Sequence, residues 1–250
     1  MQVFDAHVHV IDPRFPLVPN EGFVPEPFDV PAYRAAVAAA GLRPVGGALV
    51  AGSFQGTDQR WLLAALGDLG PGWVGVAQLP ADVSDAQLRD LDDAGVRAVR
   101  CNLARGTAPD GEGLTALATR VHDLVGWGCE LYVDSGDLAG LAPVIRDLPR
   151  VSIDHLGMSD RDQATLLRLV DGGARVKATG FGRADLDVVA TLRAVHAVDP
   201  GALVFGTDLP GTRARRPFEP ADVALLTEAL GAAALPAVLR DNARAWYRAG

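Results

Sequence analysis

The sequence predicts an α/β fold, a single (β/α)8 TIM barrel, and three observations support this prediction. Short β-rich apolar runs alternate with longer stretches of helical period along the whole chain of 250 residues. Eight such β-then-α units fit into this length, which is typical of the barrel. No interior stretch resembles a linker, so we expect one domain that covers residues 1–250.

The expected strands are short, and several of them end at residues that can carry chemistry. In chain order they are 3–10, 46–52, 73–79, 96–103, 129–135, 150–157, 175–182 and 202–208. In a barrel of this type the active site lies at the carboxyl ends of the strands. The ends of these runs are therefore where we look for function.

Several of the segments between the strands carry helix signals. Helical period is found at 31–41, 85–95 and 184–198. The first follows Asp29, a good capping residue, and stops at Gly41, while the second follows Ser84. These signals predict helices after the first, third and seventh strands.

The connection over residues 11–30 differs from the others. Its residues 12–29 read "DPRFPLVPNEGFVPEPFD", and its prolines exclude a regular helix. Long loops in compact domains are commonly functional. We expect this Pro-rich segment to be a lid or a binding loop.

Composition and charge narrow the class of protein. Hydrophobic residues make up 49% of the chain and charged residues 22%, as in soluble globular proteins. The net charge of −8 repels polyphosphate, so a nucleic-acid partner is not expected. Cys101 and Cys129 lack a CxxC spacing, which argues against a disulfide scaffold or a zinc ribbon and favours two buried thiols.

Membrane and export signals are also missing from the sequence pattern. No signal peptide precedes the first strand, and no apolar run approaches the roughly 20 residues that span a bilayer. We therefore expect a cytoplasmic protein without a membrane partner.

Three imidazoles and one carboxylate lie at or near the ends of the predicted strands. His7 and His9 in "DAHVHV" share one face of the first strand by alternation, and both should face the barrel interior. His155 lies at the end of the sixth strand, in "DHLG", and Asp208 at the end of the eighth, in "GTDLP". All four should converge at the barrel mouth. Asp154 should point to the face opposite His155 and have a structural role.

These segments carry a resemblance to a known family. The motifs are "DAHVHV", "GVRAVRCNL", "SIDHLG", "VKATGFGR", "FGTDLP" and "DNARAWY", in this order along the whole chain. They resemble the amidohydrolase superfamily, in its amidohydrolase-related (amidohydrolase 2) branch, and there the 2-pyrone-4,6-dicarboxylate lactonases and related sugar lactonases. The resemblance implies a TIM barrel of the amidohydrolase type and a hydrolase.

The resemblance also implies a set of metal ligands. In the superfamily the first-strand HxH pair and the last-strand Asp hold a divalent metal, which here would be His7, His9 and Asp208, with zinc as the expected ion. Bridging ligands on the fourth and fifth strands are replaced by Arg100, Asn102 and Tyr132, so a binuclear site is not expected. The similar lactonases share the arginine and the tyrosine and work without metal. The resemblance therefore implies either no metal or one divalent ion.

The chemistry of lactone opening assigns roles to the same groups. The reaction needs a base for water and donors at the carbonyl oxygen. Asp208 is the expected base, and Tyr132 is an expected donor. The expected oxyanion donors are His155, His7 and His9.

Arginines near the strand ends predict an anionic substrate. Arg100, Arg105 and Arg183 are expected to bind carboxylates through paired hydrogen bonds. The run of arginines between Arg213 and Arg216 either adds positive potential to the site or forms a solvated face. The expected partner is a small anionic acid or lactone, with self-association left open.

Three functions fit this sequence. The first is a hydrolase that opens a carboxylated lactone with water activated by Asp208. The second is a mononuclear zinc-dependent decarboxylase, a lyase acting on an aromatic or unsaturated acid. The third is a barrel that binds a small acid without catalysis.

Overall fold

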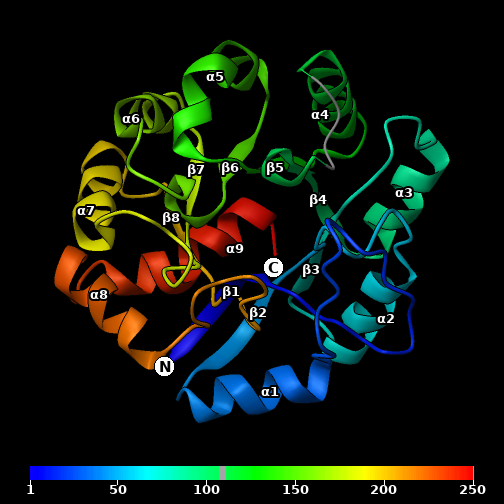
Figure 1. Cartoon of the computed structure of the whole chain (residues 1–250), viewed down its shortest axis with the longest axis horizontal. Helices are drawn as coiled ribbons and strands as arrows, with labels where there is room; N and C mark the ends of the chain where they lie inside the picture. The colour runs from blue at the N-terminus through cyan, green and yellow to red at the C-terminus, as the bar shows by residue number, and fades with distance from the viewer. Residues whose placement is uncertain (107–110, 250) are drawn as a thin grey trace.

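A computed structural model describes residues 1–106 and 111–249, and it has the predicted barrel architecture (Figure 1). Eight parallel strands form one sheet in the order β1 to β8. They are β1 (Gln2–Val8), β2 (Arg43–Val50), β3 (Trp73–Ala77), β4 (Val96–Asn102), β5 (Gly128–Tyr132), β6 (Val151–Ile153), β7 (Arg175–Ala178) and β8 (Leu203–Phe205).

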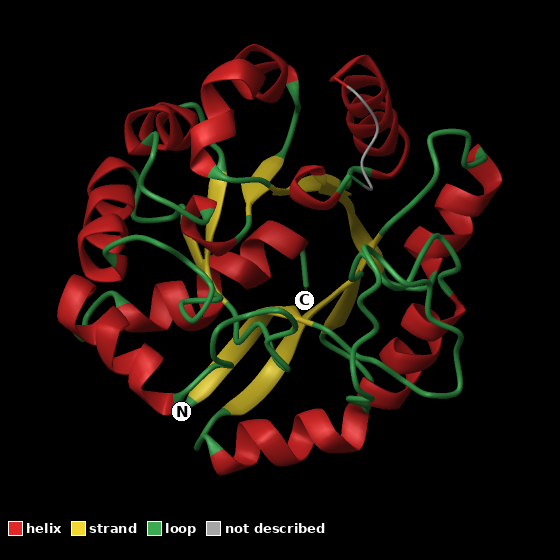
Figure 2. Ribbon diagram, viewed as in Figure 1, coloured by secondary structure: helices red, strands yellow, loops and turns green. Residues whose placement is uncertain are grey.

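Helices surround the strands as an outer ring (Figure 2). They are α1 (Val30–Ala39), α2 (Arg60–Leu69), α3 (Asp85–Asp93), α4 (Gly111–Val125), α5 (Leu138–Asp147), α6 (Gln163–Asp171), α7 (Val188–Val198) and α8 (Pro220–Leu230). Short turns of helix lie at η1 (Leu103–Arg105), η2 (Ser135–Asp137), η3 (His155–Gly157) and η4 (Ala237–Asp241). The last helix, α9 (Asn242–Tyr247), lies inside the ring of strands in the view of Figure 1.

Hydrophobic side chains form two layers. The larger cluster fills the space between strands and helices, and a smaller one lies inside the barrel. Within the smaller cluster Tyr247 of α9 stacks on Phe4 of β1, with ring centroids 5.8 Å apart. The Tyr247 hydroxyl donates a hydrogen bond to the buried Glu130 carboxylate on β5. The C-terminal helix therefore supports the polar groups inside the barrel.

Backbone contacts between the first and last strands bring the barrel ends together. The Asp208 N–H donates to the His7 carbonyl at 2.7 Å, and the His9 N–H donates to the Leu209 carbonyl at 2.8 Å. Both bonds lie beyond the end of β8 at Phe205. They place the two histidines beside the aspartate at the carboxyl end of the barrel.

Most predicted strands extend past the observed ends, because the chain leaves the sheet where it turns into the loops of the site. The predicted helix 184–198 is wrong at its start: α7 begins at Val188, after the cap Asp187, whose side chain accepts from the Ala190 N–H. The caps expected at Asp29 and Ser84 are confirmed.

The two cysteines are buried free thiols, as predicted, with 3.6 Å between their sulfur atoms. In the described ranges 1–106 and 111–249 no helix is long and apolar enough to cross a membrane.

Candidate active site

The first strand turns both of its histidines inward. The pairing of β1 with β2 shifts register between Asp5 and Val8, which indicates an irregularity at this point. Ala6 belongs to the hydrophobic cluster inside the barrel, whereas Val8, two residues later, belongs to the cluster between strands and helices. The side-chain alternation of the strand is therefore interrupted between them. His7 and His9 are 0% and 3% exposed and approach the same carboxylate, so the predicted common direction is confirmed.

His155 and Asp208 reach the site through tight turns. Both have a left-handed backbone, with φ of 52° and 59° respectively, which is uncommon for residues other than glycine. The prediction that Asp154 points away from His155 is wrong. Asp154 lies 3.4 Å from His7 Nδ1 inside the barrel. The chain leaves β6 at Ile153, so strand alternation no longer applies to His155.

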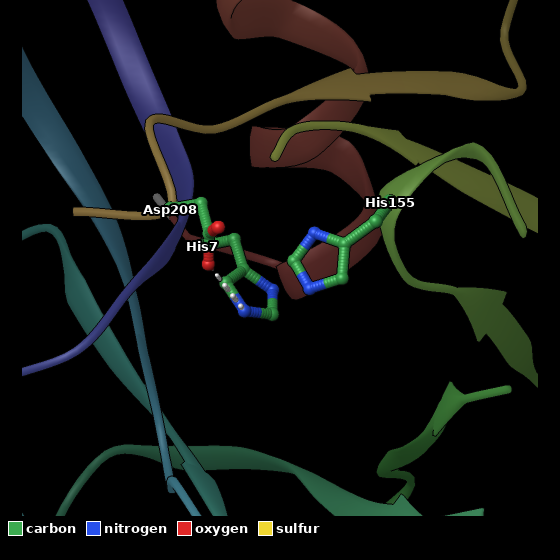
Figure 3. A group of neighbouring side chains, drawn as sticks. All are labelled: His7, His155 and Asp208. Carbon is green, nitrogen blue, oxygen red and sulfur yellow. Dashed lines mark ion pairs between the residues drawn. The ribbon is translucent and has the colours of Figure 1, made fainter. Parts of the chain in front are cut away.

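The imidazoles and the carboxylate converge as predicted, and Figure 3 shows His7, His155 and Asp208. Asp208 Oδ1 lies 3.7 Å from His7 Nε2 and 3.7 Å from His9 Nε2. His155 packs against His7 with ring centroids 4.8 Å apart. All four side chains are almost completely buried.

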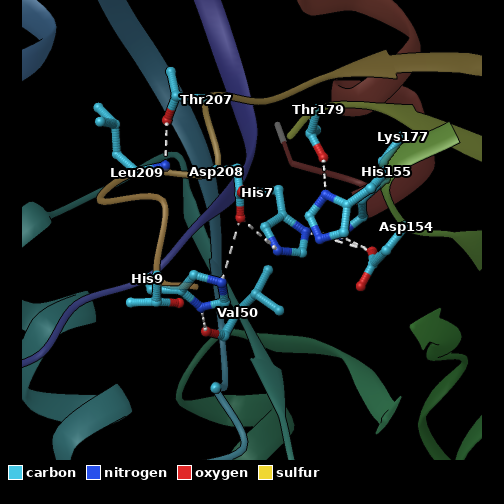
Figure 4. Close-up of polar contacts among 12 residues, drawn as sticks. His7, His9, Val50, Asp154, His155, Lys177, Thr179, Thr207, Asp208 and Leu209 are labelled. Carbon is cyan, nitrogen blue, oxygen red and sulfur yellow. Dashed lines mark hydrogen bonds and ion pairs between the residues drawn. The ribbon is translucent and has the colours of Figure 1, made fainter. Parts of the chain in front are cut away.

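Two of these atoms have no hydrogen-bond partner among the described residues. They are His7 Nε2 and Asp208 Oδ1, and both are buried. His9 Nδ1 lies 2.7 Å from the Val50 carbonyl, which can only accept (Figure 4). Neutral His9 is therefore protonated on Nδ1, and its Nε2 lone pair faces Asp208. This tautomer excludes the expected donor role for neutral His9.

The His9 lone pair directed at a carboxylate oxygen fits a bound cation. Ligand atoms of His7, His155 and Asp208 all lie within 4.8 Å of one another. His9 was expected in this set in place of His155, and it contacts the same carboxylate from the other side. A ligating histidine commonly donates its other N–H to a carbonyl, as His9 does to Val50. This buried group is compatible with a divalent metal.

Lys177 on β7 is a buried charge that the sequence interpretation missed. Its ammonium donates to Glu130 and lies 3.5 Å from Asp154 Oδ1 and 3.2 Å from His7 Nδ1. The signal was present in "VKATG", because a lysine between apolar residues of a barrel strand must face the interior. The ammonium also lies beside a second group of side chains that could bind a metal, made of His7, Glu130 and Asp154.

Arg183 fixes one side of the Asp208 carboxylate. Its Nε and Nη2 donate to Oδ2 at 2.8 and 2.6 Å, and Nη2 also donates to the Thr212 carbonyl. Burial opposes ionisation of Asp208, but the charge of Arg183 outweighs this effect and holds the pKa of Asp208 well below its usual range. Asp208 is therefore ionised, with Oδ1 left free.

Burial keeps the histidines neutral. It lowers the pKa of His155 from 6.5 to about 3, and it lowers the pKa of His7 well below its usual value. The pKa of His9 is lowered for the same reason. Neutral imidazoles can bind a metal or accept a proton, which protonated ones cannot.

A small pocket, with a cavity volume of about 30 Å³, opens beside this group. Its lining includes the expected arginines Arg100, Arg105 and Arg183, together with His9, His155, Tyr132 and Arg213. Arg100 donates to the Ala51 carbonyl and to Asp154 Oδ2, the latter at 3.3 Å, and its guanidinium lies 5.5 Å from the Tyr132 ring centroid. Of the expected site residues, all except His7 and Asp208 line this pocket.

The outer arginines behave differently from one another. Arg105 and Arg213 both donate to Glu21 Oε2, each at 3.3 Å. Arg215 instead donates to the Ala184 carbonyl, and Arg216 pairs with Asp222. Of the run between 213 and 216, only Arg213 lines the pocket.

A parallel barrel with histidines and an aspartate at its strand ends defines a barrel hydrolase of the amidohydrolase type. The sequence matches the amidohydrolase family over residues 4–249, and the chain belongs to this family. This confirms the family that the sequence motifs indicate and agrees with the predicted enzyme class, a hydrolase.

Known proteins similar to this chain include proteins named as 2-pyrone-4,6-dicarboxylate hydrolases. A 2-pyrone-4,6-dicarboxylate hydrolase from Comamonas testosteroni is 29% identical over 235 residues, covering 82% of this chain and 76% of that protein. A Pseudomonas putida structure assigned to the same activity is 28% identical, with a TM-score of 0.82 and coverage of 98% and 97%. An Acinetobacter baumannii structure with citric acid bound shares the fold, with a TM-score of 0.84, 20% identity and coverage of 99% and 100%.

Proposed function

We propose that this protein is a lactonase that opens a carboxylated lactone by hydrolysis. The observation that carries the proposal is the unpartnered Asp208 Oδ1, which lies beside two histidines and next to a pocket lined by four arginines. A carboxylate in this position can activate water, while the arginines favour an anionic substrate. The pyrone dicarboxylate hydrolases to which the chain is similar support this substrate class.

The proposed reaction begins with a water molecule held by Asp208 Oδ1. The water oxygen adds to the lactone carbonyl carbon as its proton moves to the aspartate. His155 and Tyr132, which face the pocket, donate to the carbonyl oxygen as it becomes negative. The ring C–O bond then breaks, and the proton passes from Asp208 to the leaving oxygen.

A divalent metal would fit the same group. His7, His155 and Asp208 would hold it, with His9 against the opposite side of the carboxylate. When bound, such an ion lowers the pKa of water and polarises a carbonyl. In either case Arg183 orients Asp208 so that Oδ1 faces the histidines.

A decarboxylase is the second candidate, and the compact ligand group of His7, His155 and Asp208 favours it. The two reactions differ in their products. Hydrolysis of a lactone forms a new carboxylate and releases no gas, whereas decarboxylation releases CO2. A barrel that only binds an acid would do neither.

The test is incubation of purified protein with 2-pyrone-4,6-dicarboxylate, with proton release and CO2 followed together. We expect proton release without CO2, and much slower reaction with a neutral six-membered lactone. CO2 release would favour the lyase, and no product from any carboxylated lactone would contradict the proposal. Elemental analysis before and after chelation shows whether activity follows a bound metal.

A further inference from the structure

The four arginines of the pocket fall into two groups by the carboxylates that they contact. Arg100 pairs with Asp154 and Arg183 with Asp208, and both carboxylates are buried. If either carboxylate moved away, the arginine would be left as a buried charge without a partner, which is costly. These two arginines therefore keep their carboxylate partners, although both line the pocket and Arg100 Nε has no partner among the described residues.

The other two arginines share one carboxylate that can leave. Glu21 has a side chain that is 64% exposed, and its Oε2 accepts from Arg105 Nη1 and Arg213 Nη1. In the described ranges, the other carboxylates that pair with pocket arginines are buried, whereas Glu21 is exposed. Solvent-exposed ion pairs are weak, so another anion can compete for these two guanidinium groups.

A short hairpin presents Glu21 at this position. Asn20 and Phe23 form an antiparallel bridge, and Glu21 and Gly22 between them have φ of 52° and 74°. Positive φ at both central residues is typical of the tight turns that close such hairpins. The Pro-rich segment 11–30, predicted to be a lid or binding loop, thus brings a carboxylate to the mouth of the pocket.

Arg213 anchors this hairpin independently of Glu21. It donates to the Asn20 carbonyl through Nη2 and to Asn20 Oδ1 through Nη1, the latter at 3.2 Å. Its guanidinium also lies 4.4 Å from the Phe23 ring centroid. Rotation of the Glu21 side chain can therefore free one N–H of Arg213 Nη1, while the other contacts of Arg213 hold the hairpin.

We propose that Arg105 and Arg213 form a carboxylate-binding subsite which Glu21 occupies in the free protein and from which a carboxylated ligand displaces it. Glu21 is then a specificity-determining residue that competes with the ligand. The substrate class in this inference rests on the proposed lactonase function, but the exchange itself concerns binding alone. A ligand with two carboxylates gains most, since one can face the inner pocket while the other replaces Glu21.

The test measures the Kd of benzene-1,3-dicarboxylate, a planar dianion that cannot be hydrolysed, by isothermal titration at low salt. We expect Glu21→Gln to bind it about threefold to tenfold more tightly, because two exposed ion pairs no longer compete. Glu26→Gln is the matched control, since it removes the same charge from another exposed residue of the loop and should leave the Kd unchanged.

A second comparison separates local competition from a general charge effect. In a background with both Arg105→Met and Arg213→Met, the gain from Glu21→Gln should fall below about twofold. Unchanged or weaker binding by Glu21→Gln, equal tightening by Glu26→Gln, or a full gain without the arginines would each overturn the proposal. Because no turnover is measured, a protein that fails to hydrolyse lactones but shows this pattern would contradict only the lactonase function.

Discussion

The buried charges inside the barrel, here called the floor, and the arginines with Glu21 at the pocket mouth, here called the rim, use the same kinds of charged residue in opposite ways. On the floor, Lys177 and Arg183 pair with carboxylates that are buried. On the rim, Arg105 and Arg213 share the exposed Glu21. Burial makes the floor costly to disturb, whereas solvent makes the rim pairs easy to exchange. The floor is therefore suited to holding reacting groups and the rim to selecting ligands.

The largest expected effect comes from Asp208→Asn on the floor. The amide cannot accept the proton of water, so we expect kcat on a carboxylated lactone to fall about 10³-fold or more. The Kd of benzene-1,3-dicarboxylate should not weaken, because the rim arginines are unchanged. Steady-state kinetics and titration calorimetry measure the two quantities.

The control for this variant is Glu26→Gln, which should retain the wild-type kcat. Turnover of Asp208→Asn within about tenfold of wild type would remove Asp208 as the base. If ligand binding were lost to the same extent, the main role of Asp208 would instead be to hold Arg183 in place.

Lys177→Met tests how strongly the floor depends on paired charges. It leaves Glu130 and Asp154 without the ammonium that lies between them, so we expect the free energy of unfolding to fall by about 3–5 kcal/mol. Urea denaturation measures the change. The double variant Lys177→Met with Glu130→Gln should recover part of the loss, and a loss equal to the sum of the two single variants would contradict the pairing.

The pH dependence of stability probes the buried histidines. The pKa of His155 is about 3 in the folded protein, against 6.5 for the free side chain. Between these values the unfolded chain binds a proton that the folded protein does not, so stability falls as pH falls below about 6.5. In chelator-treated protein, His155→Asn should reduce this slope by up to about 1.4 kcal/mol per pH unit. An unchanged slope between pH 6 and 4 would contradict the neutral buried imidazole.

The sequence predicts the barrel and the convergence of its strand ends well, because both follow from alternation and chain order. His7, His9, His155 and Asp208 all lie where the strand ends predict. The failures occur where the chain leaves regular structure. Turns with positive φ redirect Asp208 and His155, and the turn brings His155 to the interior that Asp154 already faces by alternation with the outward Ile153.

The sequence also does not predict which distant residues form ion pairs in the fold. Which carboxylate each arginine contacts depends on loops that meet only in the folded barrel. Arg213 approaches Glu21, which is 192 residues away in the sequence, and Arg183 approaches Asp208. The sequence indicated that the arginines face the site, but not which of them have their charge satisfied by buried groups.

The smallest expected effect is the change in the free energy of unfolding when a rim arginine is replaced. Arg213→Met removes contacts to Glu21 and Asn20 at the surface, so we expect the free energy of unfolding to change by no more than about 1 kcal/mol. The same substitution of a long cation by methionine on the floor, Lys177→Met, should cost several times more. Urea denaturation of both variants under one set of conditions makes the comparison direct. Equal losses would mean that the rim is as fixed as the floor, and a carboxylate held that firmly at Glu21 would not yield to a ligand.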